Sequence, residues 1–354
     1  MPNYKIEEID KNFKVESFEK DDMVFYNVKE KPFDLYGLYD KEIGKIFSRL
    51  PEDVAKNTNE GVEVLGKNTA GGRVRFMTDS NDIAIMVKRP DVQRMDHMPF
   101  TGSGGFDMYA DGEYVGTYRP SVEEKTEFEG ILYIENEENM HDITINFPLY
   151  NNVTELYVGI KKGSKLQGGG KYINDKPIVY YGSSITQGGC ASRPGNSYQG
   201  MISRKLNCDY INLGFSGSAK GEKAIAEYIA NLDMCCFVYD YDHNAPNVEH
   251  LKNTHEPMFK MIREKHPDLP IIIMNAPYRC AKWFCGDERT AVILETYNNA
   301  VNSGDENVYF IDIKKAVSVY GKDGTVDGCH PNDLGFRLMA DAVLEVLEKY
   351  VFNK

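Results

Sequence analysis

The sequence predicts an α/β fold in its second half, with a five-stranded parallel sheet of flavodoxin-like order, preceded by an antiparallel β-sandwich domain. After residue 176, five short strand-like runs alternate with helical patterns, and this alternation is typical of βαβ units. Before residue 165 the chain shows many short β-prone runs separated by Gly, Asn and Asp, as in antiparallel sandwiches. A length of 354 residues also favours two domains.

The first half is a series of β-prone runs broken by turn residues. Asp111-Gly112 separates two of these runs, and Asp-Gly between alternating runs is the strongest short-range signal for a hairpin. A brief helix is expected over residues 40–47. The strands are expected at residues 74–78, 83–87, 105–110, 113–118, 142–147 and 155–160.

The two halves meet at residues 164–171, where three consecutive glycines predict a linker. No G-x-x-x-x-G-K-[ST] pattern surrounds these glycines, so a phosphate-binding loop is not expected. We therefore expect one domain over residues 1–170 and a second over residues 171–354.

The second half alternates strands with helices. Apolar residues recur at helical spacing from Leu334 to Leu347, which gives the last helix an apolar face. Helices on both faces of a parallel sheet follow from this alternation. The strands are expected at residues 178–181, 210–213, 235–240, 271–274 and 308–311, and the helices at 197–207, 221–232, 248–265, 287–303 and 333–350.

The net negative charge of the protein argues against nucleic acids and anionic membranes as its partners. With a net charge of −13 and a pI near 5.1, the protein would repel nucleic acids and anionic lipid surfaces, so a neutral small molecule or oligosaccharide is the better fit. No apolar signal region and no run of membrane-spanning length are present. Seven cysteines, an odd number with an adjacent pair inside a predicted strand, indicate reduced thiols. We therefore expect a cytoplasmic protein.

Polar residues follow four of the predicted strands. They lie at Gly182-Ser183-Ser184, at residues 212–218, at residues 240–244 and at residues 327–330. Because the carboxyl ends of parallel strands meet at one edge of a sheet, we expect these segments to converge. They supply a hydroxyl, an imidazole, a carboxylate, an amide and flexible backbone donors.

These groups are the ones that acyl transfer needs. A serine hydroxyl is a weak nucleophile until an adjacent imidazole takes its proton. The imidazole needs a carboxylate to fix its tautomer and to stabilise its charged form. The oxyanion needs preorganised donors, each worth roughly 3–4 kcal/mol.

These segments resemble the blocks of the SGNH (GDSL-type) hydrolase superfamily, over about residues 177–350. The Gly-Asp-Ser block is similar to Gly182-Ser183-Ser184, and the Asp-x-x-His block is matched fully by Asp327-Gly328-Cys329-His330. Gly217 matches the glycine of the second block, and Asn244 matches the asparagine of the Gly-x-Asn-Asp block. The resemblance implies a Ser184–His330–Asp327 triad. It also implies an oxyanion hole made by the Ser184 N–H, the Gly217 N–H and the Asn244 amide.

Three positions depart from the family pattern: Ser183 and Ala245 replace aspartates, and Asp242 replaces a glycine. A subgroup of the superfamily carries an N-terminal β domain with a Gly-x-Asp-Leu-Tyr signature. Gly105-Phe106-Asp107-Met108-Tyr109 is similar to that signature, so the resemblance extends over both domains. We expect its aspartate and tyrosine to stabilise the hairpin or the domain interface.

Two further residues are candidates for binding substrate. Arg193 follows the nucleophile block and could hydrogen-bond a hydroxyl group, or it could simply be solvated. Trp283 could stack on a sugar ring, or it could be buried under its own loop. Structural interpretations also exist for Ser184, as a helix cap, and for Gly217, as a turn residue.

No metal site and no cofactor are expected. Asp240, Asp242 and His243 lie close together in the sequence, but no second histidine at ligand spacing accompanies them. Cys280 and Cys285 do not have Cys-x-x-Cys spacing.

The resemblance implies a serine esterase that removes short acyl groups, with acetyl expected, from a carbohydrate or related polyol through an acyl-enzyme. Two alternatives stay open. One is an acyltransferase that uses the same triad with an alcohol acceptor, and the other is a non-catalytic carbohydrate-binding protein. The N-terminal domain would either bind carbohydrate or wall the pocket. The sequence leaves the oligomeric state open.

Overall fold

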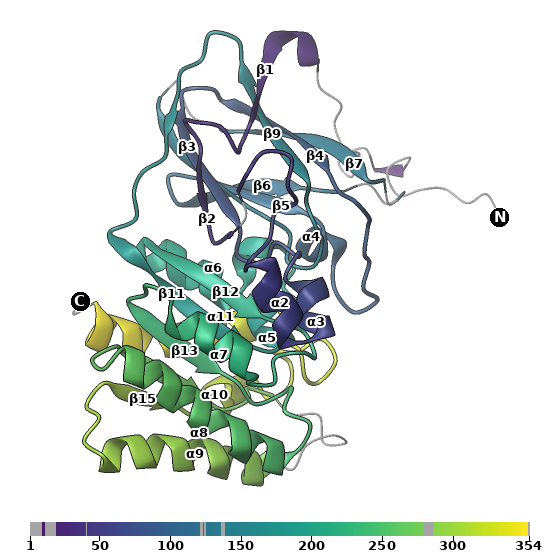
Figure 1. Cartoon of the computed structure of the whole chain (residues 1–354). Coiled ribbons are helices and arrows are strands. Elements are labelled where there is room, and N and C mark those ends of the chain that lie inside the picture. The colour runs from purple at the N-terminus through teal and green to yellow at the C-terminus, as the bar shows by residue number, and fades with distance from the viewer. Residues whose placement is uncertain are drawn as a thin grey trace, which may run out of the picture.

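The N-terminal half is a β-sandwich in the computed structural model, which describes residues 9–10, 19–39, 41–120, 123, 125–135, 139–278 and 286–352. One sheet has the strand order β1-β9-β4-β7, and the other has the order β10-β3-β8-β5-β6, with β2 paired to β3 (Figure 1). All of these pairings are antiparallel, as predicted. The strands are β1 (Met23–Asn27), β2 (Asp34–Tyr36), β3 (Arg73–Thr78), β4 (Asp82–Lys88), β5 (Phe106–Ala110), β6 (Glu113–Tyr118), β7 (Glu127–Tyr133), β8 (His141–Asn146), β9 (Glu155–Lys161) and β10 (Leu166–Gly168).

The core of the sandwich comes from alternate residues of its strands. Val74 and Phe76 of β3 and Ile143 and Ile145 of β8 are all fully buried, as the period of two in a strand requires. The predicted hairpin is confirmed, because β5 and β6 pair across Asp111-Gly112. Both turn residues have positive φ, 53° and 87°, which is the geometry that favours Asp-Gly in a tight hairpin.

The C-terminal half is an α/β domain whose strand order β12-β11-β13-β14-β15 confirms the flavodoxin-like prediction. Every strand pair is parallel. One apolar cluster lies on each face of the sheet, which is why a strand such as β14 reads as a continuous run of Ile and Met. The elements are β11 (Asn174–Gly182), α5 (Ser184–Gln187), η3 (Pro194–Asn196), α6 (Tyr198–Leu206), β12 (Cys208–Gly214), α7 (Lys223–Ala230), β13 (Cys236–Asp240), α8 (Val248–Lys265), β14 (Ile271–Met274), α9 (Gly286–Asn302), β15 (Val308–Ile311), α10 (Ile313–Ala316), η4 (Val317–Tyr320), α11 (Asp333–Val346) and η5 (Leu347–Val351).

Two short helices of the N-terminal half, α2 (Glu52–Thr58) and α3 (Glu60–Leu65), lie against the α/β domain beside α7 (Figure 1). Ala55 and Val62 of these helices belong to the apolar cluster of the parallel sheet. The brief helix expected over residues 40–47 is wrong for its described part. Residues 41–47 contain no helix; residues 43 and 44 form a turn, and Gly44 there has a φ of 83°, outside the helical range.

The predicted linker over residues 164–171 is wrong in part, because β10 lies within it and pairs with β3. The division of the chain after residue 170 stays a prediction.

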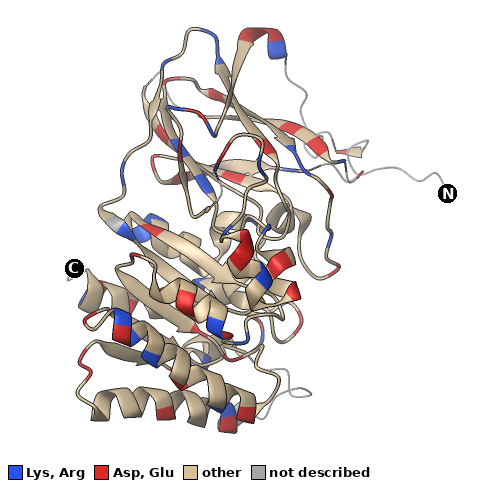
Figure 2. Ribbon diagram, in the orientation of Figure 1, with Lys and Arg blue, Asp and Glu red and all other residues tan. Residues whose placement is uncertain are grey.

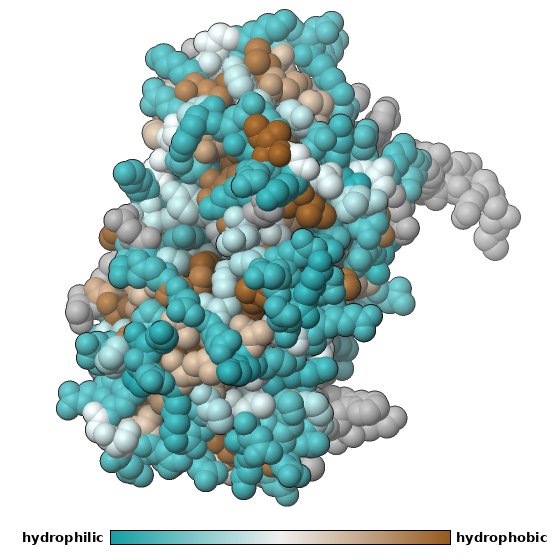
Figure 3. All heavy atoms as spheres, viewed as in Figure 1, coloured by the Kyte–Doolittle hydropathy of each residue, from teal (hydrophilic) through white to brown (hydrophobic). Residues whose placement is uncertain are grey.

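The surface carries charges of both signs. Acidic and basic residues are mixed along the helices around the parallel sheet (Figure 2), and the face seen in Figure 3 is mainly hydrophilic, with hydrophobic residues in small groups. Within the described part of the chain, no helix combines the length and apolar character that crossing a membrane requires.

Candidate active site

Three of the four predicted site segments, those of Ser184, Gly217 and Asn244, follow adjacent strands of the parallel sheet. Strand β11 lies between β12 and β13, so Ser184, Gly217 and Asn244 follow three neighbouring strand ends at the carboxyl edge of the sheet. Ser184 is the first residue of the short helix α5. Ser183, which stands where the family has aspartate, caps this helix by accepting a hydrogen bond from the Ile185 N–H at 3.1 Å.

A hydrogen-bonded chain joins the predicted triad residues. Ser184 Oγ lies 3.0 Å from His330 Nε2, and His330 Nδ1 lies 2.7 Å from Asp327 Oδ2. Asp327 Oδ1 also accepts the backbone N–H groups of Cys329 and His330, at 2.9 and 2.7 Å. The carboxylate is thus fixed by its own loop, which explains the Asp-x-x-His spacing.

These contacts set the charge of Asp327. Partial burial raises its pKa, but the hydrogen bonds from the His330 N–H, the His330 ring and the Cys329 N–H outweigh burial and lower the pKa to about 2. A carboxylate that is ionised across the neutral range holds Nδ1–H of the ring, so Nε2 presents its lone pair to the serine hydroxyl.

Two of the three predicted oxyanion donors, Gly217 and Asn244, lie in loops with defined support. Gly217 has a φ of 66° and is exposed, and the preceding Ser216 N–H donates to Gln187 Oε1 at 3.0 Å. Asn244 is half-buried, and its Oδ1 has no hydrogen-bond partner among the described residues. Arg289 of α9 holds the loop of Asn244 by donating to the carbonyls of Asp242 and Ala245, both at 2.8 Å.

Asp242, the residue that replaces a family glycine, is buried and accepts the Ala276 N–H at 3.1 Å. It therefore ties the loop after β13 to the loop after β14. His243 Nε2 bonds the carbonyl of Tyr278 at 2.8 Å. Asp242 and His243 thus both connect the loop after β13 with the loop after β14.

The N-terminal half supports the nucleophile directly, a feature that the sequence did not reveal. Tyr150 OH donates to the Ser184 carbonyl at 3.2 Å. Gln187 Nε2 donates to Asn68 Oδ1 and to the Leu149 carbonyl, both at 3.1 Å, while its Oε1 takes the Ser216 N–H. Gln187 thereby links α5, the loop of Gly217 and the N-terminal half. No motif marks Tyr150 or Asn68, because their contacts with α5 exist only after the two halves pack.

Arg49 fixes the carboxyl end of β12 from the N-terminal half. Its Nη1 donates to the carbonyls of Asn212 and Gly214 at 2.9 and 2.7 Å, and its Nε donates to the Asn68 carbonyl at 2.9 Å. The side chain is buried, and burial lowers its pKa to about 9. The carbonyls of Asn212 and Gly214 lie at the end of β12, directly before the loop that carries Gly217.

A buried carboxyl group lies behind the nucleophile helix. Asp240 at the end of β13 accepts hydrogen bonds from Thr186 Oγ1 at 2.8 Å and from Tyr198 OH at 3.3 Å. Burial raises its pKa to about 7, with a small further rise from Asp242, although both hydrogen bonds act in the opposite direction.

The Gly-x-Asp-Leu-Tyr-like segment forms a clamp between the two halves. Asp107 is fully buried and accepts hydrogen bonds from Arg193 Nη1 and the Gly195 N–H, both at 2.9 Å, and from Asn146 Nδ2 at 2.8 Å. Arg193 Nη1 also bonds Tyr109 OH. The structure therefore places the Arg193 guanidinium in an ion pair between the halves.

Trp283, Cys280 and Cys285, which the sequence analysis singled out, lie outside the described residues.

A groove of about 700 Å³ opens beside the triad, between the two halves. Asp96, His97 and Met98 line it from the loop that precedes α4 (Phe100–Ser103), and Val326 and Asp333 line it from the other half. The ring of His97 lies 5.3 Å from the ring of His330, measured between centroids. Sequence reasoning missed His97, since no motif contains it.

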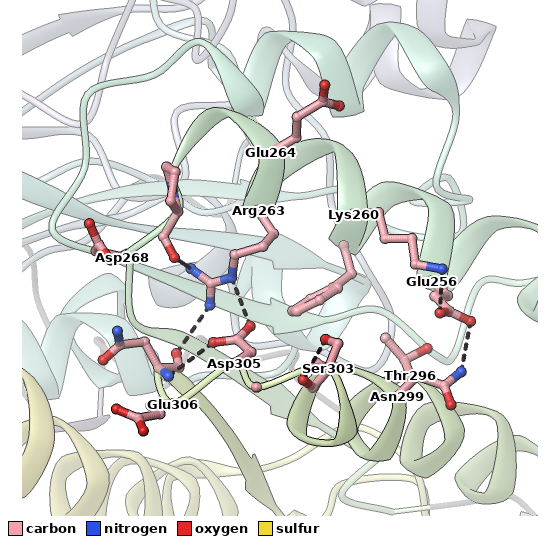
Figure 4. Close-up of a pocket in the computed structure, with 15 residues that line it drawn as sticks. Glu256, Lys260, Arg263, Glu264, Asp268, Thr296, Asn299, Ser303, Asp305 and Glu306 are labelled. Atoms are coloured by element: carbon pink, nitrogen blue, oxygen red, sulfur yellow. Dashed lines mark hydrogen bonds and ion pairs between the residues drawn. The ribbon is translucent and has the colours of Figure 1, made fainter.

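A larger cavity, about 840 Å³, lies between α8 and α9 (Figure 4). Arg263 projects into it but is engaged by Asp305 at 2.8 Å and by the Leu269 carbonyl at 2.6 Å. The loops before β14 and β15 line this cavity, so it lies at the amino edge of the sheet, away from Ser184.

Comparison with known families decides the classification. The model of the GDSL-like lipase/acylhydrolase family matches residues 175–348. The protein belongs to this family. Residues 23–166 match the GxDLY model, described as the N-terminus of SGNH hydrolase-type esterases. By family, the GDSL-type protein is an ester hydrolase.

Solved structures share the fold of this GDSL-type hydrolase. A GDSL-like lipase from Bacteroides ovatus is 28% identical, with 92% of this chain and 97% of that chain covered and a TM-score of 0.83. The salicylyl-acyltransferase SsfX3 of a tetracycline biosynthetic pathway is 18% identical, with 91% and 95% covered and a TM-score of 0.74. A family two carbohydrate esterase from Clostridium thermocellum, in complex with cellohexaose, is 17% identical, with 80% and 93% covered and a TM-score of 0.60. A search of curated proteins finds no match.

Proposed function

We propose that the protein is a serine esterase that removes short acyl groups, acetyl in particular, from a carbohydrate or related polyol. The observation that carries the proposal is the hydrogen-bonded chain from Ser184 Oγ through the His330 ring to Asp327, with links of 3.0 and 2.7 Å. Nucleophile, base and orienting carboxylate are each within hydrogen-bond reach of the next.

The reaction follows from this order of groups. Ser184 Oγ attacks the ester carbonyl as its proton passes to His330 Nε2. The oxyanion accepts hydrogen bonds from the N–H groups of Ser184 and Gly217 and from the Asn244 amide. Collapse of the intermediate expels the alcohol, which takes the proton from His330. A water molecule that His330 deprotonates then attacks the acyl-enzyme, and the acid leaves as Ser184 regains its proton.

The groove beside His330 supports an alcohol of carbohydrate size as the leaving group. Asp96, Asp323 and Asp333 contribute carboxylates to its lining, so a neutral polyol is a better fit than an anionic one. The carbohydrate esterase with bound cellohexaose, which has the same fold, supports an oligosaccharide.

The test is a screen of acetylated cello- and xylo-oligosaccharides by mass spectrometry, with the Ser184→Ala variant as a matched control. The wild type should release acetyl from at least one of them, and the variant should release none. Failure of the wild type to cleave any oligosaccharide ester or p-nitrophenyl acetate would contradict the proposal.

An acyltransferase is the second candidate, because SsfX3 shares the fold across both halves of the chain. Adding candidate alcohols to the assay separates the two reactions. Transfer to an alcohol in excess of hydrolysis would favour the acyltransferase.

The cytoplasm remains our predicted location. Cys190 and Cys236 are free and buried, and free thiols fit a reducing compartment.

A further inference from the structure

Three potential metal ligands meet beside the candidate nucleophile. One donor atom each from His97, Cys190 and His330 lies within 4.8 Å of the other two. His97 precedes α4 in the N-terminal half, Cys190 follows α5, and His330 precedes α11. Only the folded contact between the two halves brings these residues together.

The proposed hydrolysis uses only one of the three. His97 packs its ring against that of His330 and makes no hydrogen bond to a described residue. Cys190 is 2% exposed and has a φ of 105°, which non-glycine residues rarely adopt. Strained backbone of this kind persists where the surrounding structure enforces it, and it concentrates at functional sites.

The packing around Cys190 explains how its position is enforced. A Cβ placed on Gly102 of α4 would lie 2.1 Å from the Ala191 carbonyl oxygen, so the two backbones are in direct contact there. Thr101 Oγ1 donates to the Ser192 carbonyl at 2.6 Å. These contacts hold the Cys190 loop against the segment that carries His97.

Two imidazoles and one thiolate are a donor set that Zn²⁺ accepts, with water as the fourth ligand. With Zn–N of about 2.0–2.1 Å and Zn–S of about 2.3 Å, the two nitrogens and the sulfur of a tetrahedral site lie roughly 3.3–3.6 Å apart. A pair of donor atoms at the 4.8 Å limit must therefore approach by roughly 1.2–1.5 Å. The half-exposed His97, in a loop, can make that adjustment by side-chain rotation.

We propose that His97, Cys190 and His330 form a zinc site through which the metal inhibits the enzyme reversibly. Zn²⁺ takes the Nε2 lone pair of His330, which breaks the hydrogen bond to Ser184 Oγ. Cys190 binds as thiolate and releases its proton to water. Asp327 keeps the Nδ1–H of His330, which completes the carboxylate–histidine–zinc arrangement common in metal sites. Ser184 then has no base.

The inhibition rests on the proposed function, but metal binding does not, so the two are tested separately. The Ser184→Ala variant keeps all three ligands and lacks the nucleophile, and Co²⁺ serves as a coloured probe for Zn²⁺. We expect one Co²⁺ per chain, with a thiolate-to-metal charge-transfer absorption that is lost when Cys190→Ser is added. Zn²⁺ should displace the Co²⁺.

Inhibition is measured with p-nitrophenyl acetate and should be reversed by EDTA. His97→Phe keeps an aromatic ring beside His330 but removes the ligand. Because loss of even an outer partner of a metal ligand weakens binding about ten- to a hundredfold, this variant should raise the Zn²⁺ concentration for half-inhibition by at least about tenfold. Cys190→Ser should act similarly. Cys235→Ser, at the amino edge of the sheet, is the matched thiol control and should leave zinc inhibition unchanged.

Several results would overturn the site. They are Co²⁺ absorption without a thiolate band, binding unaffected by both His97→Phe and Cys190→Ser, and Zn²⁺ inhibition that these variants do not weaken. If the wild type has no esterase activity, the proposed function fails while the Co²⁺ titration still decides the site.

Discussion

Replacing Asp107, the buried carboxylate of the clamp, should lower the stability of the protein strongly. Asp107→Ala removes the acceptor of three hydrogen bonds, from Arg193, Gly195 and Asn146. The Arg193 side chain, only 20% exposed, would keep its charge without this carboxylate. Breaking a buried ion pair by removing one partner costs about 3–5 kcal/mol. We expect the free energy of unfolding to fall by about that amount.

Urea denaturation followed by circular dichroism measures the loss. The matched control is Asp111→Asn in the same hairpin, because Asp111 is 56% exposed and pairs with His141 at a site where an ion pair is worth less than about 1 kcal/mol. A second variant, Asp107→Ala with Arg193→Met, removes both charges and should recover part of the loss. If Asp107→Ala were no less stable than Asp111→Asn, the clamp would not hold the two halves together.

Two further predictions concern the carboxyl edge of the sheet. Asn244→Ala should lower kcat for p-nitrophenyl acetate about 10²–10³-fold with little change in KM, since the amide would act on the transition state; an unchanged kcat would exclude Asn244 from the oxyanion hole. The pKa of Asp240 is raised from 3.8 to about 7 in the folded protein. Between about pH 4 and 7 the folded state therefore binds more protons than the unfolded chain, and the free energy of unfolding falls as the pH rises through this range. Asp240→Asn should remove this slope, up to about 1.4 kcal/mol per pH unit, in urea titrations from pH 4 to 8, and an unaltered slope would contradict the burial argument.

The features that the sequence predicted are those that local patterns encode. Strand β14 and helix α8 have the predicted bounds, because a buried apolar run and an amphipathic period each specify their element. The resemblance of Asp327-Gly328-Cys329-His330 to the Asp-x-x-His block implied the contact between Asp327 and His330, and the structure has it because the same loop supplies both groups.

The features that the sequence did not predict depend on packing between the halves. Arg193 lies in the expected loop, but its partner Asp107 is 86 residues away and belongs to the other half. Tyr150 and His97 become neighbours of the triad only through that interface, and the bonds of Gln187 to Asn68 and Leu149 also form only there. No periodicity within one half encodes such contacts.

The central claim is that Ser184 is a nucleophile activated by His330. A fluorophosphonate probe tests it most directly, because it reacts only with an activated serine and the labelled peptide can be identified by mass spectrometry. We predict labelling of the wild type at Ser184, no labelling of Ser184→Ala, and labelling of His330→Ala reduced by orders of magnitude. Label on another residue, or equal labelling of wild type and His330→Ala, would contradict the account.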